Sequence, residues 1–195
     1  MKAIRVLLLL LFIGTAVSFP SGGAEARPIS RGDGFPGLSF RDVMSKSDRA
    51  YLGVDGKKIF SIKDMQGTLF IIEIFNTYCI ICPKNVPVLN AVYSMINSDA
   101  QLRHKVKVVS VATGNTINEA ESYKKEYKVL YPMLTDFTFA LHKALGNPRV
   151  PYTIIVKRHA RGKYVVAYTC PGVIDSAESL LNEARKILRQ EPISK

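Results

Sequence analysis

The sequence predicts an α/β fold in which a central mixed sheet carries helices on both faces. Residues 68–75 and 106–112 are nearly continuous apolar runs rich in β-branched side chains, the pattern of strands buried on both faces. Segments with helical spacing separate these runs from the strands that follow. A strand pair and a final helix then end the chain, and this alternation favours one layered α/β domain.

The first elements lie ahead of the longer apolar runs. Residues 27–37 are rich in Gly and Pro and are expected to form a linker, and the domain itself is expected to span residues 38–195. Residues 38–43 and 50–54 are predicted as short strands. The pair Asp55-Gly56 is a turn signal, so residues 57–60 are expected to return as a partner in an N-terminal β-hairpin extension.

The helices are predicted from apolar spacing and capping signals. A helix is expected soon after Cys79, kinked at Pro87, with a buried stripe of Val86, Leu89, Val92 and Ile96. A capping box over residues 116–119 opens the next helix, and residues 139–145 form a short one. Residues 152–156 and 164–169 form a hairpin. Asp175 is expected to cap a last helix with a stripe of Leu180, Leu181, Ala184, Ile187 and Leu188.

The N-terminus has the features of a secretory signal peptide over residues 1–26. Lys2 and Arg5 precede an apolar run at residues 6–17, and residues 24–26 read Ala-Glu-Ala, an A-x-A-like cleavage pattern. The run is about a dozen residues, whereas a membrane span needs about 20. The sequence therefore predicts export with cleavage, to a bacterial periplasm, and an uncleaved membrane anchor is the alternative.

The chain is strongly basic. Its formal net charge is +11, and loss of residues 1–26 would leave +10. The charges are scattered along the sequence, so a solvated basic surface that contacts anionic membrane is favoured over nucleic-acid binding. Three cysteines are too few for a disulfide-built scaffold.

The pair Cys79 and Cys82 carries the predicted chemistry. It follows a buried strand and lies at the predicted start of a helix, where unpaired backbone N–H groups and the helix dipole stabilise a thiolate. Cys79 is expected to be the exposed attacking thiol. Cys82, one turn further in, is expected to resolve a mixed disulfide, so the redox-active disulfide replaces any other cofactor.

Two further residues are expected beside this pair. Glu73 is the one charge in a strand that aims at the helix start, so burial should raise its pKa and suit it to exchange a proton with Cys82. Pro151 begins a strand that looks buried, and a cis bond after Val150 would expose backbone groups beside the cysteines.

Taken together, these motifs resemble the thioredoxin superfamily and most closely its TlpA/ResA-like branch of exported reductases. The resemblance spans about residues 33–190. It depends on GDGFP at residues 32–36, IIEIFNTYCIICP at 71–83, YPMLTD at 131–136 and RVPYT at 149–153. Tyr78 stands where the family usually has Trp, and Ile80-Ile81 is not one of its familiar dipeptides.

The resemblance implies roles for individual residues. Cys79 would be the nucleophile, Cys82 the resolving thiol, Glu73 the buried acid and Pro151 the cis-proline. Five neighbours are expected to contact the substrate: Tyr78, Ile80, Ile81, Val150 and Tyr152. The implied activity is reduction of protein disulfides, including those of apocytochrome c, with a membrane thiol reductase as electron donor.

Two other functions share the fold or the thiols. A peroxiredoxin-like peroxidase would need P-x-x-x-T/S-x-x-C, but Asn76 stands three residues before Cys79. A copper-binding chaperone would use both thiols and one of His104, His142 or His159. No metal site is expected, because tetrahedral zinc needs four ligands.

Cys170 is a third thiol that the resemblance does not explain. It ends the second hairpin strand, which runs antiparallel to the strand that starts at Pro151, so it should return to the rim of the active site near Cys79. Two roles stay open for it: a small buried hydrophobe, or a peripheral thiol that exchanges with the Cys79–Cys82 disulfide.

Overall fold

The computed structural model describes residues 27–41 and 45–190 of the 195-residue chain. The predicted signal peptide lies outside the described residues. Within the described part, no helix is long and apolar enough to cross a membrane.

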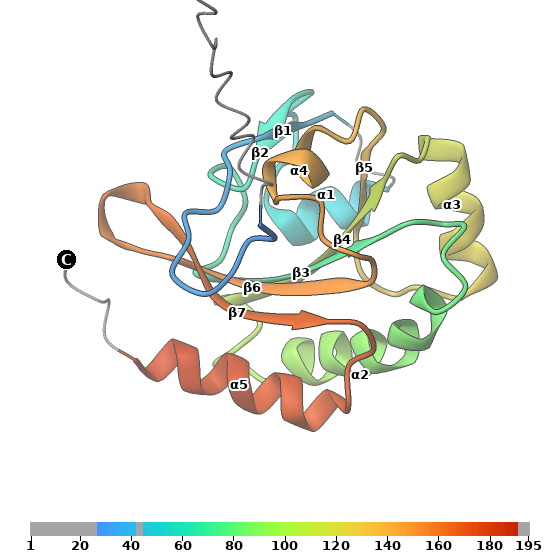
Figure 1. The fold of residues 1–195 in the computed structure, drawn as a ribbon. Coiled ribbons are helices and arrows are strands. Elements are labelled where there is room, and N and C mark those ends of the chain that lie inside the picture. Colours follow the sequence, from blue (N-terminus) through green and yellow to red (C-terminus); the bar gives the residue numbers. More distant parts are fainter. Residues whose placement is uncertain (1–26, 42–44, 191–195) are drawn as a thin grey trace, which may run out of the picture.

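A five-stranded mixed sheet forms the centre of the domain (Figure 1). Its strand order is β5-β4-β3-β6-β7, comprising Met133–Asp136, Val106–Thr113, Leu69–Phe75, Tyr152–Arg158 and Tyr164–Pro171. β3 pairs with β4 in parallel and with β6 antiparallel, and β6 pairs antiparallel with β7. All seven residues of β3 are buried, as expected for a strand covered on both faces.

Helices cover both faces of this sheet, which confirms the predicted layering. Alternate residues of β3 point to opposite faces and enter two separate cores. Leu69 and Ile71 pack with α2 (Asn85–Ser98) and α5 (Ala177–Arg189). Phe70 and Ile72 pack beneath α1 (Lys46–Leu52) and α4 (Ala140–Ala144). The expected apolar stripes of α2 and α5 lie on these buried faces.

The capping signals were right for one helix and one residue off for another. Thr116 and Glu119 form the predicted capping box at the start of α3 (Ile117–Glu126). The last helix is capped by Ser176 and not by Asp175, since the Ser176 hydroxyl accepts a hydrogen bond from the Ser179 N–H. Pro87 lies in the first turn of α2, where a missing backbone donor costs little.

The N-terminal two-stranded sheet is present, but its connection differs from the prediction. β1 (Ser39–Phe40) pairs antiparallel with β2 (Phe60–Ser61). The predicted strand at residues 50–54 is wrong, because α1 occupies residues up to Leu52. Ser45 caps its start through the Asp48 N–H and Gly53 ends it with a positive φ of 70°, and these two caps outweigh the short apolar run.

The segment expected as a linker runs along the free edge of β7. Gly32 N–H donates to the Val166 carbonyl, Val166 N–H donates to Asp33, and Phe35 N–H donates to Tyr164. This segment therefore covers the part of the sheet edge that is furthest from the end of β7.

Candidate functional site

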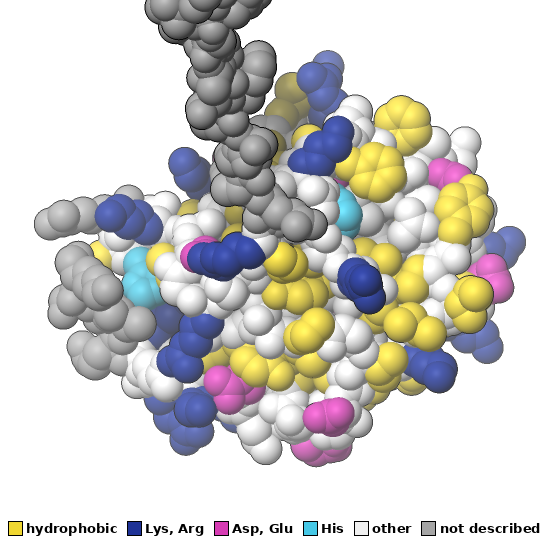
Figure 2. All heavy atoms as spheres, viewed as in Figure 1, with side chains coloured by type: hydrophobic (Ala, Val, Ile, Leu, Met, Phe, Trp, Pro, Cys, Tyr) yellow, Lys and Arg dark blue, Asp and Glu magenta, His cyan; other side chains and the backbone are white. Residues whose placement is uncertain are grey.

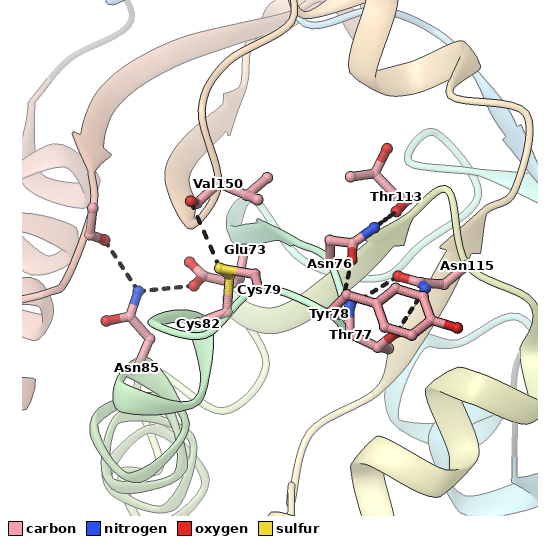
Figure 3. Close-up of a disulfide and its surroundings, with 11 residues drawn as sticks. Glu73, Asn76, Thr77, Tyr78, Cys79, Cys82, Asn85, Thr113, Asn115 and Val150 are labelled. Atoms are coloured by element: carbon pink, nitrogen blue, oxygen red, sulfur yellow. Dashed lines mark hydrogen bonds between the residues drawn. A yellow bond between two sulfur atoms is a disulfide. The ribbon is translucent and has the colours of Figure 1, made fainter.

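Cys79 and Cys82 form a disulfide just beyond the end of β3, with a Cα–Cα distance of 5.4 Å (Figure 3). Cys82 opens a 3₁₀ turn, η1 (Cys82–Lys84), that leads into α2, whereas Cys79 lies three residues earlier in the loop. Cys82 is 2% exposed and belongs to the core, while Cys79 is only half-buried. The two sulfurs therefore differ in accessibility in the predicted direction.

Asn and Thr side chains hold the loop that carries Cys79. Asn76 Nδ2 donates to the Thr113 carbonyl over 2.7 Å, and its Oδ1 accepts from Tyr78 N–H over 2.8 Å. The buried Asn115 accepts from Thr77 N–H over 3.0 Å and donates to the Thr77 hydroxyl over 2.6 Å. These contacts tie the loop to the end of β4, and the sequence analysis missed them because loop polar residues have no periodic signal.

Glu73 is buried in the middle of β3, 3% exposed. Burial is the largest influence on this carboxyl group and raises its pKa from 4.5 to about 7, against two hydrogen bonds that lower it. The bonds come from the Thr153 hydroxyl and from Asn85 Nδ2. A group with this pKa can both accept and release a proton near neutral pH.

Asn85 is a second site residue that the sequence analysis missed. It is 1% exposed at the start of α2 and bridges three elements. Its Nδ2 donates to Glu73 Oε1 over 2.8 Å and to the Gly172 carbonyl over 3.2 Å, and its Oδ1 accepts from Ile174 N–H over 2.9 Å. In the sequence, Asn85 is marked only by its position immediately before the apolar stripe of a helix. An ordinary helix-capping residue has the same position, so the sequence did not identify Asn85 as a site residue.

Glu73 and Cys82 line one small cavity beneath the disulfide, together with Asn85. The cavity has about 10 Å³ of free volume, which is about the space that one water molecule needs. Figure 3 shows the Glu73 carboxylate on the inner side of the disulfide, with Asn85 beside it. Glu73 and Cys82 therefore face the same cavity, which has room for about one water molecule between them.

The loop before β6 faces the outer sulfur. The Val150–Pro151 peptide bond is cis, and the Val150 carbonyl oxygen lies 3.8 Å from Cys79 Sγ. Pro151 is buried, and its carbonyl accepts from Gly172 N–H over 2.8 Å. The structure therefore brings Val150 and Pro151 to the disulfide from a segment about seventy residues away in the sequence.

Exposed apolar side chains surround the disulfide. Ile80 is 93% exposed, Tyr78 is 75% exposed, and Ile81 and Val173 are each exposed by more than 40%. The Tyr78 hydroxyl donates to Glu119, which fixes the ring over the surface. Apolar side chains exposed to water are energetically unfavourable, and contact with another molecule would bury them. These residues are therefore candidates for contact with a partner.

Tyr152 does not belong to this surface, contrary to the prediction. It is 7% exposed, packs in the core beneath α1 and α4, and donates its hydroxyl to the Ile29 carbonyl over 2.7 Å. Strand alternation explains the difference: Thr153 points to Glu73, so its neighbour Tyr152 must point to the opposite face of the sheet.

Cys170 lies on β7 directly opposite Thr153, the residue that contacts Glu73. It is a free, half-buried thiol that packs against the same core as Cys79 and Cys82. Burial raises its pKa. The antiparallel pairing of β6 and β7 places Cys170 at the same end of the sheet as Pro151, as predicted. Its exchange with the Cys79–Cys82 disulfide stays a prediction.

The histidines lie apart from the cavity that Cys82 lines. His142, for example, contacts the Pro148 carbonyl over 2.9 Å. Among the residues that the structure describes, no three His, Cys, Asp or Glu side chains cluster in a way that could hold a metal ion.

No protein-family model and no curated protein matches the chain. The fold, however, matches many solved structures. The thioredoxin domain of a thiol-disulfide oxidoreductase from Bacteroides vulgatus superposes with a TM-score of 0.60 at 15% identity, over 83% of this chain and 99% of that one. StoA from Bacillus subtilis gives 0.55 at 19% identity, over 77% and 98%.

A secreted thiol-disulfide isomerase from Corynebacterium glutamicum gives a TM-score of 0.59 at 15% identity, over 80% of this chain and 86% of that one. At these identities the likeness concerns the fold. It confirms that the chain has a thioredoxin-like fold, with its disulfide between Cys79 and Cys82.

Proposed function

We propose that this protein is an exported thiol–disulfide oxidoreductase that reduces disulfides in other proteins. The observation that carries the proposal is the asymmetry of the disulfide. Cys79 is half-buried under exposed apolar side chains, whereas Cys82 is buried and shares a cavity with an acid whose pKa is raised to about 7. An attacking thiol needs access and a resolving thiol needs a proton acceptor, and the two positions provide these separately.

The first step uses the accessible sulfur. In the reduced protein, the Cys79 thiolate attacks one sulfur of a substrate disulfide. A mixed disulfide forms between Cys79 and the substrate, and the other substrate sulfur leaves as a thiolate that takes a proton from water. The Val150 carbonyl, 3.8 Å from Cys79 Sγ, marks where substrate backbone would lie.

The second step uses the buried sulfur. Cys82 gives its proton to the Glu73 carboxylate and attacks Cys79 Sγ, so the mixed disulfide breaks and the Cys79–Cys82 disulfide forms. The second substrate sulfur leaves as a thiolate. Two electrons pass from the protein to the substrate, and a reductant of the thiol class must restore the dithiol.

Several facts support an extracytoplasmic protein substrate. The apolar surface of Tyr78, Ile80, Ile81 and Val173 suits an unfolded chain better than a small polar molecule. The features of residues 1–26 support export to the periplasm, where a membrane thiol reductase would donate electrons. The disulfides of apocytochrome c are one substrate class that fits this setting.

The proposal is tested by the reduction of insulin disulfides with the purified protein and dithiothreitol. Wild-type protein is expected to accelerate the reaction, and Cys79→Ser is expected to abolish the acceleration. Cys170→Ser, which removes the thiol outside the disulfide, measures whether that thiol contributes to the rate. Equal rates with wild type and Cys79→Ser would rule out the proposed function.

A further inference from the structure

The end of the domain opposite the disulfide holds a broad groove with a strong positive charge. Its volume is about 700 Å³, and it lies between the start of β3, the loop before β4, the end of β6 and the end of α5. Among the residues that the structure describes, five cationic side chains and one acidic side chain line it: Lys105, Lys157, Arg158, Arg185, Arg189 and Asp99. Charges that are scattered along the sequence are thus gathered by the fold.

Contacts within the groove hold part of this charge in place. Lys157 Nζ donates to the Ile187 carbonyl over 2.8 Å at the end of α5. The Arg158 guanidinium donates to the Met65 carbonyl over 2.6 Å and lies 5.3 Å from the Tyr164 ring centroid. These contacts hold the charged ends of the Lys157 and Arg158 side chains in fixed positions at the groove.

The one acid that lines the groove within residues 27–41 and 45–190 already has a cationic partner. Asp99 accepts from Arg185 over 3.3 Å and from the backbone N–H of Gln101 over 2.8 Å, and these bonds lower its pKa. Lys105 and Arg189 are exposed and form no ion pair within the described residues. These two side chains are the ones available to an incoming anion.

None of the described residues that line the groove is an exposed large hydrophobic side chain. A protein partner usually buries an apolar centre in its interface, whereas lipid headgroups need only positive charge at the surface. Figure 2 shows several Lys and Arg side chains beside the end of α5, with others around the rest of the face, and hydrophobic side chains mostly over the middle and right. The composition of the groove therefore favours a membrane over a protein.

The position of the groove is compatible with activity at a membrane. Thr68, which lines the groove, precedes β3, and Cys79 follows β3, so the seven residues of the strand separate the two by about 20 Å. A molecule held by the groove would direct its disulfide away from the surface, toward substrates in solution.

We propose that this groove binds the phosphate-bearing headgroups of anionic phospholipids and docks the protein on a membrane surface. The choice of a membrane as partner rests on the export proposed above. Lys105 and Arg189 contact the headgroups, and the fixed charges of Lys157 and Arg158 supply the surrounding positive potential. No covalent step is involved.

The test is co-sedimentation of the full chain with vesicles of phosphatidylcholine containing about 30% phosphatidylglycerol, at about 0.1 M salt. Lys105→Gln combined with Arg189→Gln is expected to lower the partition coefficient about 25-fold, which is about fivefold for each charge. The matched control combines Lys125→Gln with Lys143→Gln, because both are exposed cations remote from the groove. It removes the same charge and should change the partition less than about twofold.

Several outcomes would overturn the inference. If both double variants lose vesicle binding equally, net charge alone attracts the protein to the membrane. If the protein binds pure phosphatidylcholine vesicles equally well, an apolar segment accounts for the binding. Displacement by inorganic phosphate, or binding of polyglutamate without vesicle binding, would make the ligand a free anion or an acidic polypeptide. Insulin reduction by the same variants is expected to stay at the wild-type rate, so failure here leaves the redox proposal standing.

Discussion

Asn85 Nδ2 donates a hydrogen bond to Glu73 Oε1 over 2.8 Å, and this contact joins the helix that follows the disulfide to the buried acid. The Thr153 hydroxyl contacts the other oxygen of Glu73. A threonine hydroxyl can donate to a carboxylate or accept from a neutral acid, whereas Asn85 Nδ2, the atom that faces Glu73, can only donate. The site can therefore hold Glu73 in either protonation state, with the proton of the neutral form on the side of Thr153.

Glu73→Gln is expected to slow turnover and to change the pH dependence of stability. The folded pKa of Glu73 is raised to about 7, so stability is lost as pH rises from about 4.5 through 7. The neutral glutamine avoids this loss and should stabilise the protein by about 1–3 kcal/mol at pH 8, with no gain at pH 4. Denaturant unfolding at both pH values measures the difference.

The same variant tests the proton transfer. Insulin reduction by wild-type protein should accelerate as pH rises through about 7, because the carboxylate form of Glu73 accepts the Cys82 proton. Glu73→Gln should lower the rate by roughly 10²-fold and remove that inflection. An unchanged pH profile in the glutamine variant would show that another base serves Cys82.

Asn85→Ala is expected to raise the pKa of Glu73 further, because the Asn85 hydrogen bond lowers it. The midpoint of the pH–rate profile should therefore move above its wild-type value. The variant also leaves Ile174 N–H and the Gly172 carbonyl without their partner, at a cost of roughly 2–4 kcal/mol in stability.

Asn90→Ala separates the two effects. Asn90 also bridges α2 to a loop, through Lys128 and Leu130, but it is not among the groups whose hydrogen bonds shift the pKa of Glu73. It should lose stability and keep the wild-type midpoint. If both variants shift the midpoint equally, Asn85 has no specific effect on Glu73.

Ile80→Ser should raise KM for insulin several-fold and leave the rate with a small disulfide such as oxidised glutathione nearly unchanged. Ile80 is 93% exposed beside Cys79, so its side chain is free to contact a protein substrate. Ile59→Ser is the control, since Ile59 is 50% exposed but lies before β2. A similar KM in all three proteins would exclude Ile80 from substrate contact.

Cys170 should react slowly with iodoacetamide at pH 7, since burial raises its pKa and leaves little thiolate. Mass mapping of the partly oxidised protein measures whether it pairs. Cys170→Ser is expected to leave turnover within about twofold of wild type if the residue only packs. A disulfide that includes Cys170, together with slower turnover in the serine variant, would support the exchange role.

The sequence predicted most of the sheet because β3 and β4 are long, β-branched and buried on both faces, a pattern with one interpretation. It predicted a strand at residues 50–54, where α1 ends, because a short apolar run is compatible with either a strand or a helix. There the Ser45 and Gly53 caps decided the outcome. Local signals of this kind compete at close to equal strength, and tertiary packing selects between them.

The site was predictable where chemistry fixes residue type and spacing, as for Cys79, Cys82 and the lone charge of Glu73. It was not predictable where contacts join distant segments. Asn85 meets Gly172 across 87 residues of sequence, and the basic groove gathers its positive charges from three segments, the loop before β4, β6 and α5. Tyr152 was wrongly expected to contact the substrate: its neighbour Thr153 points to the buried acid, so Tyr152 points into the opposite core.

Trapping of the mixed disulfide tests the central claim most directly. Cys82→Ser and Cys79→Ser are each incubated with an oxidised protein substrate, and the adducts are identified by mass spectrometry after alkylation. The structure predicts that Cys82→Ser accumulates an adduct through Cys79, the half-buried sulfur, and that Cys79→Ser accumulates none because Cys82 is 2% exposed. Adducts through Cys82, or none in either variant, would contradict the assignment of Cys79 as the attacking thiol.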